Sequence, residues 1–202
     1  MKRYYFITDA KLSRAGNVSD VENAIKAKAD VIQYRDKYKN TNQMYEEAVK
    51  LRAICRNIKF LINDRVDIAL AVDADGVHVG NEDLPYLVAR KLLGKNKIIG
   101  VTVHNLKEAQ TAEKLGANYL GVSPIFLTAT KPDAGKPAGL ELIKQIKKNV
   151  SLPIVAIGGI NLSNARDVVN AGADSLCAIS AVVAAADVKE EIEKFQVLFN
   201  EK

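Results

Sequence analysis

The sequence has 202 residues, 48% of them hydrophobic and 26% charged, which is the composition of one globular domain with a full core. No apolar run approaches the roughly 18 residues of a membrane span, and the apolar stretch near the N-terminus is too short for a signal peptide. The net charge of +5 is spread along the chain without an arginine-rich block, which disfavours nucleic-acid binding and fits attraction to small anionic substrates.

Short β-branched apolar runs alternate with longer segments of helical period along the whole chain. The runs predict strands at Tyr4–Thr8, Val31–Arg35, Phe60–Asn63, Gly76–Gly80, Ile98–Val103, Tyr119–Ser123, Ile154–Ile157 and Leu176–Ser180. The segments between them predict helices, among them Asn42–Arg56, Leu84–Leu93, Leu106–Leu115, Leu140–Lys148 and Asn164–Asn170. A glycine suited to a C-terminal cap follows three of these helical runs, at Gly94, Gly116 and Gly172.

Near-continuous apolar strands are typical of a parallel sheet that is covered by helices. About eight strand–helix units in 202 residues predict a single-domain (β/α)8 TIM barrel over residues 1–202. The alternative is an open doubly wound sheet. That fold favours a G-x-G-x-x-G turn after the first strand, where this sequence has Asp9-Ala10-Lys11 instead.

The two cysteines, Cys55 and Cys177, lie far apart in apolar surroundings and form no C-x-x-C pair. This pattern predicts two unlinked thiols in the core and a reducing compartment, so we expect a cytoplasmic protein. An oligomer is compatible with the sequence.

The second predicted strand ends in polar and cationic residues. Because side chains alternate along a strand, Gln33, Arg35 and Lys37 are expected on one side of it, at the barrel mouth where such folds place their active sites. The guanidinium and ammonium groups could bind a phosphate or diphosphate. The alternative is that they form salt bridges with neighbouring acids.

The third and fourth predicted strands are each followed by an aspartate. Asp64 and Asp83 would supply hard oxygen ligands to Mg²⁺, which takes one or two carboxylates and completes its shell with water and substrate phosphate. Glu82 is a possible additional acid. The alternative is that Asp64 and Asp83 only cap the helices that follow them.

The fifth and sixth predicted strands carry a histidine and hydroxyl groups at their ends. His78 and His104 lack the spacing of a zinc site, and a lone histidine is more often structural than catalytic. In the loop after the sixth strand, Thr128 and Thr130 precede Lys131, and together they could bind phosphate oxygens. This loop is the longest irregular stretch and is expected to cover the substrate.

Two glycines follow the seventh predicted strand. Gly158 and Gly159 would let a phosphate approach backbone N–H groups, and the loops after strands seven and eight are a frequent phosphate site in this fold. Ile179 and Ser180 end the eighth predicted strand at the same site. The alternative is a tight turn that needs positive φ angles.

The assembled segments resemble the thiamine phosphate synthase family over essentially the whole chain. They follow their strands in order: QYRDK at 33–37, NDR at 63–65, DGVHVGNED at 75–83, TATK at 128–131, IGGI at 157–160 and IS at 179–180. Members of this family join a pyrimidine methyl diphosphate to a thiazole phosphate and release diphosphate. No single segment would be specific, but all six in order are.

The resemblance implies a role for each matching position. Contacts to the pyrimidine diphosphate are implied for Gln33, Arg35, Lys37, Asn63, Thr102 and Lys131, and Mg²⁺ binding for Asp64 and Asp83. A site for the thiazole phosphate is implied for Thr128, Thr130, Gly159, Ile179 and Ser180, with Gly158 in the same turn. Within the matching segments, Tyr34, Asp36 and Ala129 are further substrate-binding candidates. Arg35, Lys37 and Lys131 are the catalytic candidates, because they would neutralise the leaving diphosphate.

Two alternatives use the same fold. A thiazole tautomerase, which resembles this family, would keep the thiazole phosphate site and use a histidine, with His104 as the candidate. It would not need the five pyrimidine and Mg²⁺ residues together, which favours the synthase: Arg35, Lys37, Asn63, Asp64 and Asp83. A non-catalytic protein that binds phosphorylated ligands is the other alternative.

Overall fold

The computed structural model describes residues 4–128, 130 and 135–200. The strands are β1 (Tyr5–Ile7), β2 (Val31–Tyr34), β3 (Lys59–Asn63), β4 (Gly76–Val79), β5 (Ile98–Val103), β6 (Tyr119–Val122), β7 (Ile154–Ile157) and β8 (Ser175–Cys177). The helices are α1 (Asn17–Lys26), α2 (Thr41–Ile54), α3 (Val66–Ala71), α4 (Tyr86–Leu93), α5 (Leu106–Leu115), α6 (Gly139–Asn149), α7 (Ala165–Asn170), α8 (Ile179–Val183) and α9 (Val188–Asn200).

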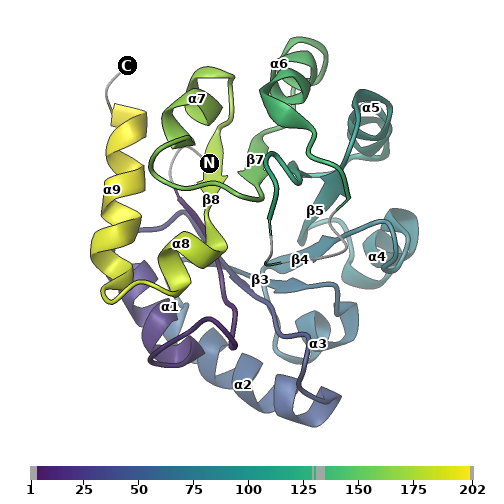
Figure 1. Cartoon of the computed structure of the whole chain (residues 1–202). Coiled ribbons are helices and arrows are strands. Elements are labelled where there is room, and N and C mark those ends of the chain that lie inside the picture. The colour runs from purple at the N-terminus through teal and green to yellow at the C-terminus, as the bar shows by residue number, and fades with distance from the viewer. Residues whose placement is uncertain (1–3, 129, 131–134, 201–202) are drawn as a thin grey trace.

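The strands form one parallel sheet that curves into a barrel. Each strand pairs with the next in chain order from β1 to β8, and a bridge between Tyr4 and Leu176 joins the last strand to the first. The helices surround the sheet, as Figure 1 shows. The predicted TIM barrel is therefore confirmed, and the open doubly wound alternative is wrong because its sheet would have two free edges.

Most predicted elements agree with the structure to within one or two residues, and Ile98–Val103 and Ile154–Ile157 match it fully. The prediction of a strand over Leu176–Ser180 is wrong, because β8 ends at Cys177 and Ile179 and Ser180 begin α8. A short apolar run does not distinguish a strand from a short buried helix by its period. The glycines predicted to end helices do have positive φ angles, of 74° at Gly94, 88° at Gly116 and 112° at Gly172.

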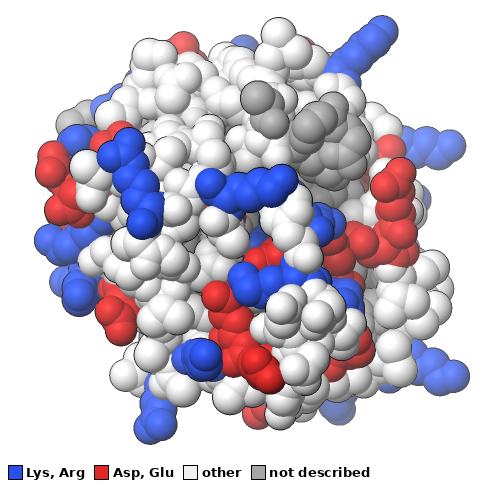
Figure 2. Space-filling model, turned by 60° about the horizontal axis from the view of Figure 1, so that its bottom comes forward, with Lys and Arg blue, Asp and Glu red and all other residues white. Residues whose placement is uncertain are grey.

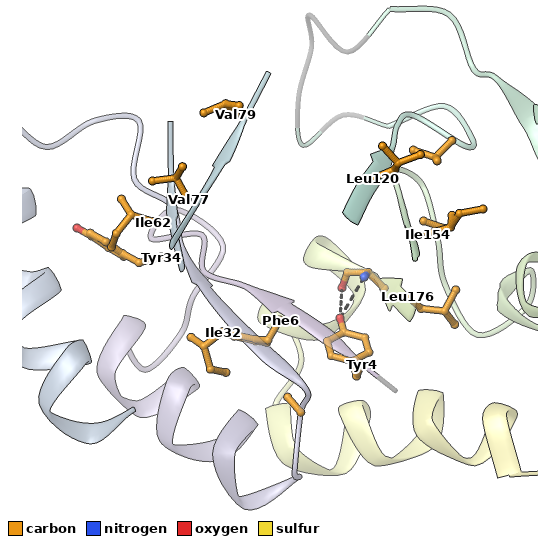
Figure 3. Packing of buried hydrophobic residues seen from close by; sticks show 14 of the residues in the cluster. Tyr4, Phe6, Ile32, Tyr34, Ile62, Val77, Val79, Leu120, Ile154 and Leu176 are labelled. Atoms are coloured by element: carbon orange, nitrogen blue, oxygen red, sulfur yellow. Dashed lines mark hydrogen bonds between the residues drawn. The ribbon is translucent and has the colours of Figure 1, made fainter. Parts of the chain in front are cut away.

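Alternation along the strands divides the core in two. Tyr4, Phe6 and Ile32 belong to the larger cluster between the sheet and the helices, part of which is drawn in Figure 3. Tyr5 and Val31 belong to a smaller cluster in the barrel interior. A parallel sheet buried on both faces gives this division, and it explains why the strands are almost continuously apolar.

The described helices include none that is both long and apolar enough to cross a membrane. Both cysteines are free and buried, as predicted, and burial raises the pKa of the Cys55 thiol to about 12.

Candidate active site

A cavity of about 680 Å³ lies at the carboxyl ends of the strands. Its walls come from the carboxyl ends of the strands, β1 included, and from the loops that follow them, which is where TIM barrels carry their active sites. Figure 2 shows acidic and basic side chains interleaved near the middle of the face it presents. A nucleic-acid-binding face would instead be expected to carry a stripe of positive charge.

The cationic wall of the cavity comes from β2 and the residues after it. Gln33, Arg35 and Lys37 all line the cavity, so the prediction that they share one side is confirmed. In this structure both cations also have acidic partners. Arg35 Nη1 lies 3.2 Å from Asp9 Oδ2, and the Lys37 ammonium pairs with the Asp64 carboxylate. The salt-bridge alternative therefore holds for the structure as it stands, and the pairs hold both cations at the cavity wall.

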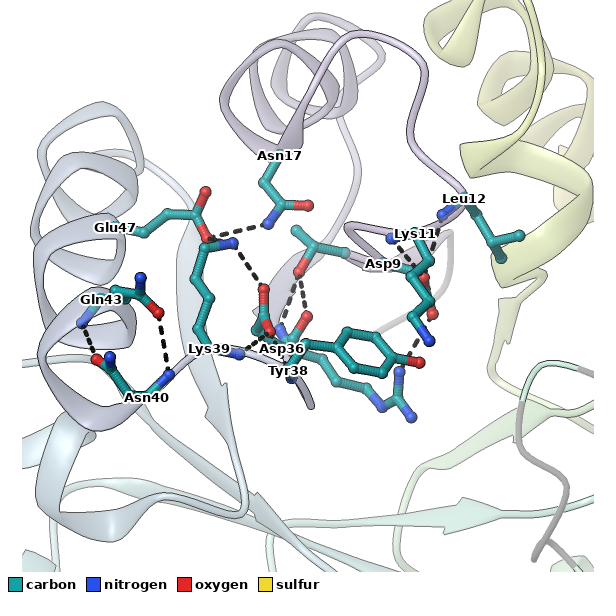
Figure 4. Close-up of polar contacts among 12 residues, drawn as sticks. Asp9, Lys11, Leu12, Asn17, Asp36, Tyr38, Lys39, Asn40, Gln43 and Glu47 are labelled. Carbon is teal, nitrogen blue, oxygen red and sulfur yellow. Dashed lines mark hydrogen bonds and ion pairs between the residues drawn. The ribbon is translucent and has the colours of Figure 1, made fainter.

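Arg35 is oriented by two residues at the end of β1. Its backbone exchanges hydrogen bonds with the Thr8 hydroxyl, at 2.9 and 3.0 Å. The Asp9 carboxylate also accepts bonds from the N–H groups of Lys11 and Leu12, which fixes its position (Figure 4). Asp9 was not among the predicted site residues, although its position directly after the first predicted strand places it at the barrel mouth.

Tyr34 and Asp36 point away from the cavity, whose described lining contains neither. Tyr34 is buried between the sheet and the helices. Asp36 accepts bonds from the N–H groups of Tyr38 and Lys39 and from the Lys39 ammonium (Figure 4). Burial alone would raise the pKa of Asp36, but these bonds together lower it. Asp36 therefore stabilises the turn that carries Lys37, and its role as a substrate contact stays a prediction.

The acidic wall lies at the tips of β3 and β4. Asn63, Asp64 and Asp83 line the cavity, and Asp83 accepts a 2.7 Å bond from the N–H of Gly80. Burial raises the pKa of Asp83 to about 6, and the neighbouring Asp64 carboxylate adds to this shift. The helix-capping alternative is wrong, because α3 and α4 begin after Arg65 and Pro85 without a side-chain cap bond.

Asp64 and Asp83 are arranged so that they could share one cation. Asp64 has a φ of 62°, and its N–H donates to the carbonyl of His78 on β4, which holds the loop beside the β4 tip. Among the described residues no group of three or more acidic, histidine or cysteine side chains could hold a metal. Two carboxylates suit a hard cation that takes its remaining ligands from water and substrate.

The opposite wall, from β6 to β8, is built from glycines, hydroxyls and backbone. Thr128, Thr130, Gly158 and Gly159 line the cavity. The loop after β6 lies against this turn, because Phe126 donates a 3.0 Å bond to the Gly158 carbonyl. Gly158 and Gly159 have φ angles of 101° and 64°. The tight-turn alternative is therefore confirmed, and it is compatible with a phosphate at the same turn.

Steric crowding explains why Gly159 has no side chain. A Cβ atom there would lie 2.4 Å from the carbonyl oxygen of Leu127. Ile179 and Ser180 line the cavity from the first turn of α8, the position of the short extra helix of TIM-barrel phosphate sites. Ala129 and Lys131 lie outside the described residues.

Thr102 and both histidines also line the cavity. His78 contacts the Thr102 hydroxyl through Nε2, at 2.8 Å. His104 contacts the carbonyl oxygen of Ser123 through Nδ1, at 2.6 Å. Because a carbonyl only accepts, Nδ1 of His104 carries a proton. His78, which the sequence predicts to be structural, therefore bonds directly to the predicted substrate contact Thr102.

Comparisons with known proteins agree with the motifs. Residues 4–182 match the family model described as thiamine monophosphate synthase. The chain is 53% identical to the thiamine-phosphate synthase of Methanosarcina barkeri, covering 95% of this chain and 88% of the relative. It is also 53% identical to that of Chloroflexus aurantiacus, covering 97% and 92%. A thiamine phosphate pyrophosphorylase structure from Pyrococcus furiosus has a TM-score of 0.90 and 44% identity, with 99% of this chain and 96% of that one covered. The chain therefore belongs to the thiamine monophosphate synthase family and is a transferase.

Proposed function

We propose that the chain joins 4-amino-2-methyl-5-(diphosphooxymethyl)pyrimidine to a thiazole phosphate, with Mg²⁺, and releases diphosphate. The observation that supports this best is the composition of the cavity. One wall carries Arg35 and Lys37 beside two carboxylates, and the other presents hydroxyls and backbone at a glycine turn. Two phosphorylated substrates of different charge fit two walls of different chemistry.

In this proposal the wall from β2 to β4 binds the diphosphate. Arg35 and Lys37 would exchange their present partners, Asp9 and Asp64, for phosphate oxygens. Asp64 and Asp83 would hold Mg²⁺, which supplies positive charge to the leaving diphosphate. Lys131, from the matching segment, would add a further positive charge.

The wall from β6 to β8 would bind the thiazole phosphate. Thr128 and Thr130 offer hydroxyls, and the turn at Gly159 lets the phosphate approach the backbone closely. The first N–H groups of a helix lack intrahelical partners, so Ile179 and Ser180 at the start of α8 are suited to phosphate oxygens.

The bond changes need no nucleophile from the protein. The bond between the pyrimidine methylene and the diphosphate oxygen breaks, and its electron pair leaves with diphosphate. The thiazole nitrogen then donates its lone pair to the methylene cation and forms the new C–N bond. The protein contributes charge at the leaving group and holds both substrates in one cavity.

The test mixes purified protein with both substrates and Mg²⁺ and follows thiamine phosphate and diphosphate. We expect turnover that EDTA abolishes. Full activity of Asp64→Ala/Asp83→Ala would remove the metal assignment. Isomerisation of a thiazole phosphate without condensation would identify the tautomerase alternative, and binding without any turnover would identify the non-catalytic one.

A further inference from the structure

A chain of hydrogen bonds crosses the barrel interior beneath the cavity. Gln33 Nε2 donates to the Tyr5 hydroxyl at 2.8 Å, and that hydroxyl lies 2.6 Å from the hydroxyl of Tyr119. Tyr119 in turn lies 2.9 Å from His78 Nδ1, and His78 Nε2 lies 2.8 Å from the Thr102 hydroxyl. We call these five residues the barrel relay. Its two ends, Gln33 and Thr102, both line the cavity.

The inner part of the relay is shielded from solvent. Tyr5 and Tyr119 are each 1% exposed and His78 is 5% exposed. Burial raises the pKa of both tyrosines far above the usual value, so both stay neutral hydroxyls. Glycines make room for the rings: a Cβ at Gly100 would lie 2.0 Å from the Tyr119 ring, and one at Gly121 would lie 2.8 Å from His78.

The orientation of the Gln33 amide, with Nε2 facing the Tyr5 hydroxyl, determines which way the protons of the relay point. An amide nitrogen can only donate, so Tyr5 accepts from Gln33 and turns its own proton to Tyr119. Tyr119 then donates to His78 Nδ1, which must be unprotonated. The proton of the neutral ring is consequently on Nε2, and it is donated to Thr102.

With Gln33 Nε2 facing the Tyr5 hydroxyl, the opposite tautomer leaves a buried donor unmet. A proton on Nδ1 of His78 would make Tyr119 an acceptor there and turn the Tyr119 proton to Tyr5. Tyr5 would then accept from both Gln33 and Tyr119, and its own proton would have no acceptor in the relay. A buried unmet donor costs free energy, so the Nε2–H form is favoured.

We propose that His78 is a positioning residue that sets the polarity of the cavity floor. Because Thr102 accepts from His78, its own proton is directed to an acceptor on the substrate. At the other end Gln33 presents its amide oxygen, which is buried and has no hydrogen-bond partner in the described part of the chain. The floor thus offers one acceptor and one donor. This proposal rests on the proposed function, whose aminopyrimidine diphosphate carries an amino donor and several acceptors.

The tautomers can be measured directly. The sequence has two histidines, and the structure requires opposite forms of them: Nε2–H for His78 and Nδ1–H for His104. We expect ¹⁵N-histidine NMR at alkaline pH to show one ring of each kind, with His104→Ala identifying the second. A proton on Nδ1 of His78 would overturn the proposal.

Two substitutions of His78 separate positioning from packing. An asparagine amide reaches the place of Nδ1, and a glutamine amide reaches the place of Nε2. We expect His78→Gln to keep kcat/KM for the pyrimidine diphosphate within about threefold and His78→Asn to lower it about tenfold or more. The KM for the thiazole phosphate should not change in either. Equal losses in both variants, in proportion to lost thermal stability, would leave His78 a purely structural residue.

Tyrosine substitutions test the relay without altering the histidine. Tyr119→Phe removes one hydroxyl and should lower kcat/KM for the pyrimidine diphosphate about fivefold, with both His78 tautomers now visible by NMR. The matched control is Tyr86→Phe, a buried tyrosine on α4 whose hydroxyl donates to the carbonyl of Gly116. A single His78 tautomer in Tyr119→Phe, unchanged from the parent, would contradict the relay.

Failure of the proposed function would be recognised separately. A parent protein that makes no thiamine phosphate contradicts the proposed activity, whereas the NMR tautomers of His78 test the relay in the absence of any substrate. The Nε2–H form of His78 in a protein without this activity would therefore support the proposed polarity of the cavity floor and contradict only the assignment of its substrate.

Discussion

The two walls of the cavity offer different chemical groups to the proposed phosphorylated substrates. The wall from β2 to β4 uses charged side chains. In the structure Lys37 pairs with Asp64, whereas Arg35 pairs with Asp9 after β1. The wall from β6 to β8 uses backbone conformation, with two adjacent glycines at positive φ. Charged side chains can stabilise the negative charge that develops on a leaving group, whereas backbone N–H groups at a turn bind an anion whose charge does not change in the reaction. The difference therefore fits the proposed function, in which diphosphate leaves from one wall and the thiazole phosphate is retained at the other.

The largest effect is expected at the acidic pair. Asp64→Asn/Asp83→Asn removes both negative charges while keeping the size of the side chains. Without these carboxylates Mg²⁺ would no longer be held beside the leaving diphosphate, so kcat should fall about a thousandfold or more. Steady-state kinetics with increasing Mg²⁺ measures this. Restoration of the rate by excess Mg²⁺ would show that the two carboxylates only tune affinity.

A smaller loss is expected at the cation of the TATK segment. Lys131→Ala should lower kcat well over tenfold, since a charged group on a leaving diphosphate contributes a few kcal/mol. Lys144→Ala is the control, because Lys144 is exposed on α6 and pairs only loosely, at 3.8 Å, with Glu141. Equal rates for the two variants would mean that Lys131 is merely solvated.

The backbone wall can be tested at its glycine. Gly159→Ala should raise the KM for the thiazole phosphate about tenfold, because the added Cβ would force Leu127 and the loop after β6 to move. The matched control is Gly94→Ala, whose φ of 74° is similarly strained but whose Cβ would meet no atom within 4 Å. Strain at positive φ should cost each variant about 1 kcal/mol of stability, and the contact with Leu127 should add to this loss in Gly159→Ala. A KM effect of the same size in the control would attribute the loss to strain alone.

Most of the residues predicted for both walls line the cavity, but the sequence specifies a strand better than it specifies a short helix, for a physical reason. Alternation along β2 is enough to place Gln33, Arg35 and Lys37 together, because a strand has a fixed period of two. The end of β8 was predicted wrongly because five residues of apolar sequence, Ile179–Val183, fit a helix as well as a strand. The barrel relay joins side chains of five different strands, and its pairs are separated by up to 114 residues. No local pattern specifies such contacts.

The smallest predicted effect concerns the acidic pair without metal. The pKa of Asp83 is raised from 3.8 to about 6 by burial and by Asp64, so the folded state favours the protonated form. The stability that the protonated Asp83 side chain contributes is fully present below about pH 4 and is lost as the pH rises through 6. We therefore compare the unfolding free energy of Asp83→Asn with that of the parent, in EDTA, at pH 4 and at pH 8. The difference in favour of the variant should be about 1 kcal/mol larger at pH 8 than at pH 4, a value reduced for partial solvent exposure. Urea denaturation at both pH values measures this difference.

Asparagine is chosen because it can still accept the bond from the N–H of Gly80, so the hydrogen bond is kept and only the charge is lost. A difference between variant and parent that is the same at both pH values would mean that burial and Asp64 do not raise the pKa of Asp83. The ionised Asp83 would then cost the fold no free energy in the absence of metal.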